Sequence, residues 1–421
     1  MRKHWHPADE PDEVVFAACE RFLFELGEHF KEDDSSQAKT TGLTDIYAGK
    51  EGPAALAAQW IKTNLPKYSC INRQSIYPLF WEAIRRKYLI LMPPRNKELA
   101  KEIAYRYRYA PQYDVDPNII QVVEAREELA HEQVANVGAD LVLSLIEKVA
   151  QAKMEKTQTA KRKSKKEILD KAVHIGFGAG ITGMAVARRI AQRIHNRRGF
   201  PRLVIHALSA GSFSWEHPEV SPNTYFRFFD DSLTKVECVG LYGPVVTDSR
   251  GYKKLKETPG MRESFRRAGE IDIVVTALAS AQDKHGMLQQ FLTNLIQEAD
   301  KDTPEGKNEC GTIREYLNML RSADWKGELQ FRPFSSTGPI KIDHGIRAVT
   351  LLELDDYKHM AEQKNKYVVL LASPCRDCKR TRTDALWHLM TQPALRLWNY
   401  LVIDIKTVDE LLALPSISET P

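Results

Sequence analysis

The sequence has few cysteines and no long hydrophobic run. Six cysteines are scattered through 421 residues, and only Cys375 and Cys378 lie close together. They are too few and too scattered for a disulfide framework. No apolar segment approaches the roughly 20 residues of a membrane-spanning helix, and Met1–Pro7 lacks the apolar core of a signal peptide. We therefore expect a cytoplasmic protein with no membrane contact.

The sequence also lacks a strong charge imbalance. Sixty Lys and Arg residues against 56 Asp and Glu give a formal charge of +4, and 43% of the residues are hydrophobic. This composition is typical of globular proteins, and the length predicts two or three domains. One local exception is Lys156–Lys166, which carries six positive residues and no acid. Such a run is usually a solvated helix or linker, but it could contact phosphates.

Residues 1–95 show the order helix, helix, turn, helix, strand. Apolar spacing predicts helices at Val14–His29, Pro53–Asn64 and Asn72–Lys87, followed by a strand at Tyr88–Met92. This order is that of a winged helix-turn-helix DNA-binding domain.

The last of these helices carries side chains suited to DNA. Arg and Gln can read base edges in a bidentate manner, whereas Ser and Tyr can hold phosphates. The residues assigned to DNA contact are Arg73, Gln74, Ser75, Tyr77, Arg85 and Arg86. Pro78 is expected to break the helix unless the helix starts near Ser75. The alternative is that residues 1–95 form the small helical cap of an enzyme.

The apolar pattern predicts a helical connector with a basic insert at residues 96–170 and an α/β domain at residues 171–415. In the connector, Asn96–Tyr107 and Ala125–Gln151 have helical periodicity around a short strand at Asn118–Val123. Beyond it, apolar runs alternate with amphipathic helices, which argues for a mostly parallel, Rossmann-like sheet. The expected strands are Val173–Phe177, Leu203–Ala207, Lys235–Gly240, Ile271–Ala277, Val349–Leu351, Tyr367–Ala372 and Tyr400–Asp404.

A glycine-rich segment between the first of these strands and the next helix is the most informative motif. Glycine lets the backbone turn sharply and approach a ligand, and a helix N-terminus offers free N–H groups to an anion. The residues assigned to this effector site are Gly176, Gly178, Ala179, Gly180, Ile181 and Thr182, with Ser209 from the end of the second strand.

Gly178–Gly183 also satisfies G-x-G-x-x-G, the pattern of a dinucleotide enzyme. That interpretation requires an acidic residue at the end of the second strand. Leu203–Gly211 offers only His206 and Ser209 as polar side chains. An NAD(P)- or sugar-phosphate-dependent enzyme remains the alternative, and no catalytic residue, cofactor or metal is assigned.

Taken in order, several segments of the chain resemble the SorC family of bacterial sugar-responsive transcriptional regulators. Asn72–Tyr77 and Glu82–Leu89 resemble the recognition helix and wing, and His174–Gly178 resembles the effector loop. The other matching segments, in the order of the family, are Leu241–Val245, Asp272–Thr276, Arg332–Gly338, Lys379–Leu386 and Tyr400–Leu412.

The resemblance implies a sugar-phosphate effector domain on a fold like the ribose-phosphate isomerase and CoA-transferase group. It also implies a homo-oligomer, a dimer or tetramer, that binds operator DNA. By position, Gly178–Thr182 would contact the phosphate, and Lys379 would pair with a second anionic group. Gly180 occupies the position where the family has threonine, and Thr182 is the nearest hydroxyl.

Two further features remain open at the level of sequence. Cys375-x-x-Cys378 follows a strand and precedes a helix, so it is either a redox pair or an ordinary turn of the effector site. A zinc site would need two more ligands, and no second C-x-x-C or nearby His pair is present. The polar residues from Arg332 to His344 form either a ligand-contacting loop or a surface hairpin, and Asp272 is either a cap or a sugar-hydroxyl acceptor.

Overall fold

The computed structural model describes residues 5–33, 52–86, 88–89, 92–107, 119–125, 129–159, 171–195, 197–211, 217–230, 232–299, 303–343 and 345–415. The internal contacts divide the chain into two units, Met1–Leu91 and Met92–Pro421. The basic run beyond Thr159, Lys87 and His344 lie outside the described residues. No described helix is both long and apolar enough to cross a membrane.

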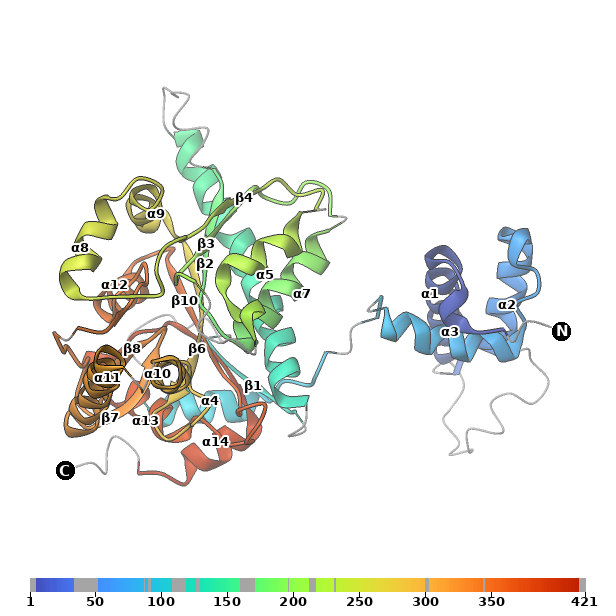
Figure 1. The fold of residues 1–421 in the computed structure, drawn as a ribbon. Helices are drawn as coiled ribbons and strands as arrows, with labels where there is room; N and C mark the ends of the chain where they lie inside the picture. Colours follow the sequence, from blue (N-terminus) through green and yellow to red (C-terminus); the bar gives the residue numbers. More distant parts are fainter. Residues whose placement is uncertain are drawn as a thin grey trace. The chain divides into compact units, whose positions relative to one another are not determined.

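The smaller unit consists of α1 (Asp12–Asp33), α2 (Pro53–Asn64) and α3 (Arg73–Arg85). Helix α1 packs against both α2 and α3 (Figure 1). The side chain of Asn72 caps α3 by accepting hydrogen bonds from the amides of Gln74 at 2.9 Å and Ser75 at 3.1 Å. The fully buried core residues of this unit include Val14, Val15, Ala57, Ile61, Ile76 and Leu79. Helices α2 and α3, joined by the short 3-10 turn Pro66–Tyr68, form the expected helix-turn-helix.

The helix expected at Asn72–Lys87 is confirmed as α3, but two other local predictions in this unit are wrong. Helix α3 begins at Arg73 and keeps Pro78 inside it, although the proline suggested a start near Ser75. The cap at Asn72 fixes the start of the helix and offsets the single hydrogen bond that proline cannot donate. The strand expected at Tyr88–Met92 is not formed by its described residues, because Tyr88 and Leu89 lie in a bend and Met92 is irregular.

The larger unit is built on a nine-stranded sheet. Seven strands are parallel, in the order β1-β11-β10-β6-β2-β3-β4, and the antiparallel strands β7 and β8 extend the sheet from the end of β6. The strands are β1 (Ile120–Val123), β2 (Val173–Phe177), β3 (Leu203–Ala207), β4 (Val236–Val239), β6 (Ile273–Ser280), β7 (Trp325–Leu329), β8 (Arg332–Ser335), β10 (Tyr367–Ala372) and β11 (Tyr400–Asp404). The predicted parallel α/β fold is confirmed.

Helices cover both faces of this sheet (Figure 1). One face packs against α5 (Ala130–Thr159) and α7 (Ile181–Ile194). The other face packs against α4 (Lys97–Arg106), α8 (Ser249–Glu257), α12 (Leu354–Glu362), α13 (Thr383–Thr391) and α14 (Ile405–Leu412). The remaining helices of this unit are α9 (Arg262–Arg267), α10 (Met287–Glu298) and α11 (Pro304–Ser322).

The stretch expected as a connector contributes to this unit. Strand β1 pairs with β11, and α5 packs on α7 and β10. The strand expected at Val349–Leu351 is displaced to β9 (Arg347–Ala348), which pairs antiparallel with β5 (Val246–Thr247) in a separate two-stranded sheet. Strands this short carry no alternation from which sequence could predict them.

The chain reverses its direction across the sheet between β2 and β6. From β2 it proceeds to β3 and β4 on one side, and from β6 it proceeds to β10 and β11 on the other. In open parallel sheets such a switch point leaves a crevice beyond the carboxyl ends of the strands, where ligands bind.

A buried histidine pair joins the neighbouring strands β2 and β3. His174 Nδ1 and His206 Nε2 are 3.0 Å apart, and burial lowers the pKa of His174 to about 4 and that of His206 to about 3. Asp272, at the amino end of β6, accepts the His174 amide at 2.9 Å and pairs with Lys153 at 2.6 Å. Asp272 is therefore a structural residue and not a sugar-hydroxyl acceptor.

The histidine pair predicts that the protein loses stability in mild acid. Histidines of the unfolded chain bind protons below their ordinary pKa of about 6.5, whereas these two stay neutral in the folded state until the pH falls to about 4 or 3. Between these limits, each contributes a fall of about 1.4 kcal/mol in unfolding free energy per pH unit of acidification. His206→Gln should reduce the slope of unfolding free energy against pH by about that amount, measured by urea unfolding between about pH 4.5 and 6. An unchanged slope would contradict the assignment.

Candidate functional site: a cavity at the carboxyl ends of β2, β6 and β10

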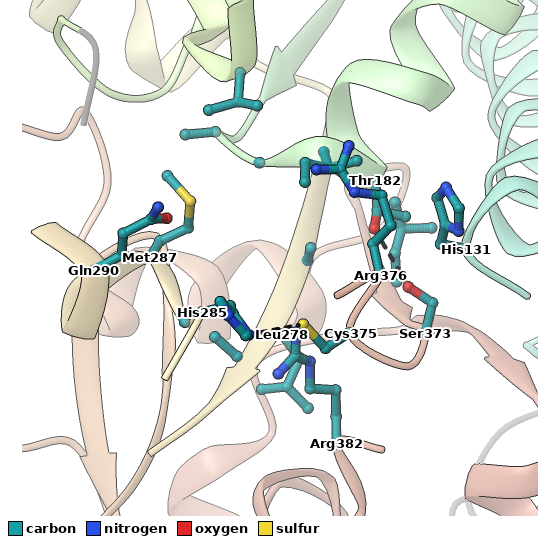
Figure 2. Close-up of a pocket in the computed structure, with 18 of the residues that line it drawn as sticks. His131, Thr182, Leu278, His285, Met287, Gln290, Ser373, Cys375, Arg376 and Arg382 are labelled. Atoms are coloured by element: carbon teal, nitrogen blue, oxygen red, sulfur yellow. Dashed lines mark hydrogen bonds between the residues drawn. The ribbon is translucent and has the colours of Figure 1, made fainter. Parts of the chain in front are cut away.

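A cavity of about 330 Å³ lies at the switch point. It is lined by the loop after β2, the ends of β6 and β10 with the loops that follow them, and the start of α10 (Figure 2). His131 at the start of α5 and His217 beside the 3-10 turn Pro218–Val220 complete the wall. The cavity therefore occupies the place where the topology predicts a ligand.

Four of the predicted effector residues line the cavity, namely Ala179, Gly180, Ile181 and Thr182. Gly180 adopts φ +124°, a conformation that side-chain-bearing residues rarely reach. Gly176 and Gly178 do not line the cavity, but the absence of a Cβ at each position leaves room for a neighbouring side chain. A Cβ at Gly176 would approach Leu208 to 2.7 Å, and a Cβ at Gly178 would overlap the Gln330 amide.

The backbone amides of this loop fall into two groups. Ala179 N–H donates to Gln330 Oε1 at 2.8 Å, and Gly180 N–H donates to the Val220 carbonyl at 3.1 Å. These amides already have protein partners. The next three, from Ile181 to Gly183, open α7, and no acceptor for them is found among the described residues. The amides that are open to a ligand therefore begin at Ile181, three residues after the Gly178 at which the sequence predicted the contacts to begin.

Gln330 holds the loop in place. Its Nε2 also donates to the Ala179 carbonyl at 3.2 Å and to Thr276 Oγ1 at 3.3 Å. Gln330 and Phe331 form the turn between β7 and β8, with φ values of +48° and +62°. Sequence reasoning missed Gln330 because 151 residues separate it from Ala179.

Tyr225 is a second support that the sequence did not indicate. Its fully buried hydroxyl donates to the Val220 carbonyl at 2.7 Å and lies 3.0 Å from the Gly180 carbonyl. Burial raises the pKa of this phenol, so it remains a neutral donor. The Tyr225 hydroxyl and the Gln330 amide together fix the loop that begins α7.

Positive charge reaches the cavity from the loop after β10. Arg376 lines the cavity and extends toward Thr182, whose Oγ1 lies 3.3 Å from Ser373 Oγ (Figure 2). The Arg376 guanidinium also contacts His217 Nε2 at 3.4 Å and the Asp377 carboxylate at 3.2 Å. Burial lowers the pKa of His131, which also lines the cavity, so this ring is neutral near pH 7.

Glu328 adds a polar group to the cavity wall. It is 2% exposed and accepts the Leu288 amide at 2.6 Å, and burial raises its pKa to about 8. Glu328 is thus mainly protonated at neutral pH. A neutral carboxyl group can both donate to and accept from a hydroxyl of a ligand.

The other predicted effector residues lie elsewhere. Lys379 lines a different hollow together with Asp384 and Glu410, and Ser209 is fully buried beside Thr350. From Arg332 to Asp343, no described residue lines the cavity. Arg332 is buried against Glu353 at 2.9 Å, and Ser335 accepts from the Gly338 amide in a hairpin turn. This polar cluster is a structural hairpin, not a ligand-contacting loop.

The predicted DNA-contacting residues of α3 divide into an exposed face and a buried network. Arg73, Tyr77 and Arg85 share the spacing of one helical face with Trp81, and all four are exposed, as is Gln74. Ser75 takes part in the cap with Asn72.

Arg86 belongs to the network. Its side chain is 15% exposed, pairs with Glu82 at 2.6 Å and Asp12 at 2.7 Å, and donates to the carbonyls of Ala8 and Glu10. Arg86 therefore fastens the N-terminal segment to α3, whereas Arg85 keeps 67% of its side chain exposed.

No family model and no curated protein matches the sequence. Among solved structures, the chain is similar to the full-length sorbitol operon regulator SorC from Klebsiella pneumoniae, with 12% identity and a TM-score of 0.52 over 96% of this chain and 100% of that one. It is also similar to a probable sor operon regulator from Shigella flexneri, with 13% identity and a TM-score of 0.50 over 75% of this chain and 99% of that one. The resemblance to SorC regulators is confirmed at the level of the fold.

The role of Gln330 predicts a stability defect when its amide is removed. Gln330→Met would leave the amide and carbonyl of Ala179 without partners, at a cost of about 1–3 kcal/mol in unfolding free energy. Gln290→Met is the matched control, since Gln290 lines the same cavity and no side-chain hydrogen bond of it is found in the described part of the chain. Equal unfolding free energies of the two variants, measured in urea, would refute the role.

Proposed function

We propose that this chain, which has the fold of the SorC regulators, is a DNA-binding transcriptional regulator whose larger unit senses a phosphorylated sugar. The observation that carries the proposal is the convergence of the free α7 amides, Thr182 and Arg376 on one cavity in that unit. The helix-turn-helix in the smaller unit supplies the second half of the proposal.

The chemistry of the cavity favours a phosphate at one end and hydroxyl groups at the other. Amides at a helix N-terminus, a hydroxyl and a guanidinium together suit the oxygens of a phosphate group. Glu328 and the amide side chain of Gln290 also line the cavity and can bond to sugar hydroxyls. A volume of about 330 Å³ suits a small ligand of this kind.

The dinucleotide alternative lacks its acidic partner. Strand β3 ends at Ala207 and is followed by Leu208 and the buried Ser209. Among the described residues from 203 to 211, no carboxylate is available for a ribose hydroxyl. The NAD(P)-dependent form of the enzyme hypothesis is therefore less well supported than the regulator.

The regulator would act as a homo-oligomer, a dimer or a tetramer, on operator DNA. Two α3 helices would then read half-sites about one helical turn apart, or a multiple of it. A ligand that binds one arrangement of subunits more tightly would shift the spacing of these helices, and DNA would shift ligand affinity by the same factor.

Arg376→Gln should weaken effector binding, whereas Lys379→Gln should not. A charge-assisted hydrogen bond contributes about 1.5–3 kcal/mol, so its loss should raise the Kd about 10- to 150-fold. The measurement is a thermal shift titration of each full-length variant with phosphorylated pentoses and hexoses, their unphosphorylated forms and inorganic phosphate. A wild-type response to none of the phosphorylated sugars would contradict the effector proposal.

Arg73→Ala and Arg85→Ala should each weaken DNA binding by about 1–3 kcal/mol if the side chain reads a base. If the side chain contacts a phosphate, the slope of log K against log salt should instead fall by about 1. Mobility shifts on DNA from upstream of the gene provide the measurement, and Lys254→Ala, an exposed lysine of α8, is the control. Wild-type protein without salt-sensitive DNA binding would exclude the regulator.

A further inference from the structure

Two loops of the larger unit bring together four side chains that can ligate a metal. Asp283 and His285 lie between β6 and α10, and Cys375 and Cys378 lie between β10 and α13. One ligand atom from each lies within 4.8 Å of all the others. We call these four residues the Cys-His-Asp cluster. None of them is used by the proposed effector or DNA contacts.

The distances within this cluster match those around a tetrahedral ion. Cys375 Sγ lies 3.5 Å from His285 Nδ1, Cys378 Sγ lies 3.6 Å from Asp283 Oδ1, and His285 Nδ1 lies 3.5 Å from Asp283 Oδ1. Tetrahedral zinc, with bonds of about 2.0–2.3 Å to such atoms, would separate its ligands by about 3.3–3.8 Å. These three pairs of ligand atoms are thus already at the separations that zinc requires.

In the loop between β10 and α13, backbone hydrogen bonds form a turn around Cys375. Cys375 N–H donates to the Arg380 carbonyl at 2.8 Å, and Lys379 N–H donates to the Cys375 carbonyl at 3.0 Å. Lys379 adopts φ +59°, which closes the turn immediately after Cys378. The backbone amides of Cys378 and Asp377 point at the Cys375 sulfur and hydrogen-bond to it.

Hydrogen bonds also fix the loop between β6 and α10, which carries Asp283 and His285. Gly286 N–H donates to the Asp283 carbonyl at 2.9 Å, and His285 N–H donates to Asp283 Oδ1 at 2.9 Å. The second carboxylate oxygen of Asp283 pairs with Arg382, and both side chains are nearly buried. Such an outer partner orients a ligating carboxylate.

We propose that the Cys-His-Asp cluster binds one zinc ion in a structural site. Two thiolates, a neutral imidazole and a carboxylate are a ligand set that zinc accepts, and four protein ligands leave no open position for catalysis. The divalent ion with these ligands carries one net negative charge, which Arg382 balances. The ion would join the loops after β6 and β10 and so fix one wall of the cavity, to which His285 and Cys375 belong (Figure 2).

The alternative for the two cysteines is a disulfide, and it leaves the other half of the cluster unexplained. Oxidation would join Cys375 and Cys378 within a single loop without using His285 or Asp283. The juxtaposition of a nitrogen and an oxygen ligand from a loop about 90 residues away favours a metal.

The test is metal analysis of the full-length chain, purified under reducing conditions without an affinity tag. We expect one zinc per chain, and reconstitution with Co²⁺ should give a thiolate-to-cobalt charge-transfer band and tetrahedral d–d bands. Cys378→Ser and His285→Ala should lose most of the bound zinc and alter the cobalt spectrum. Both residues are exposed enough for these variants to fold.

Cys70→Ser and Cys238→Ser are the controls, since both cysteines are exposed and lie outside the cluster. Both should retain one zinc per chain. The proposal is overturned if the reduced wild-type chain binds neither zinc nor Co²⁺ stoichiometrically. It is also overturned if Cys378→Ser and His285→Ala bind zinc as tightly as wild type, or if mass spectrometry finds only a Cys375–Cys378 disulfide and the reduced chain stays metal-free.

Discussion

The pairing of β2 with β6 determines where everything else in the larger unit lies. It joins Ile175–Phe177 to Ile273–Val275 in parallel register, so two strands separated by about 100 residues end at the same edge of the sheet. The glycine loop after β2 then faces the loops after β6 and β10. Without this register, neither the free amides of α7 nor the Cys-His-Asp cluster would border the same cavity.

The elements with strong local signals could be predicted from sequence. Buried parallel strands such as Tyr367–Ala372 form continuous apolar runs, and α2 and α7 carry clear helical periodicity. The position of the glycine loop could also be predicted, because glycine spacing and the start of a helix are local properties. The short strands β5 and β9 could not, since two residues carry no period.

The hydrogen-bond partners of the site residues could not be predicted from the sequence. Gln330, Tyr225 and His285 each act on residues far away in the chain, and nothing in their neighbourhood distinguishes them from other polar residues. Lys379 illustrates the opposite error. The family resemblance placed its positive charge in the effector site, but in the structure its side chain lines a neighbouring hollow instead. Arg85 and Arg86 are adjacent in sequence and both pair with Glu82, yet only Arg85 remains exposed, because Asp12 and the carbonyls of Ala8 and Glu10 engage Arg86.

The turn that carries Gln330 has a thermodynamic consequence. A two-residue hairpin turn with positive φ at both positions normally uses Asn-Gly, and a longer side chain there costs on the order of 1 kcal/mol or more. Gln330 and Phe331 accept this strain, and Phe331 packs against Phe291 of α10 while Gln330 bonds to Ala179. The hairpin thus links α10 and the glycine loop mechanically through a strained turn. A displacement of α10 or of the glycine loop would therefore change the backbone strain in the turn at Gln330 and Phe331, and through it the position of the other element.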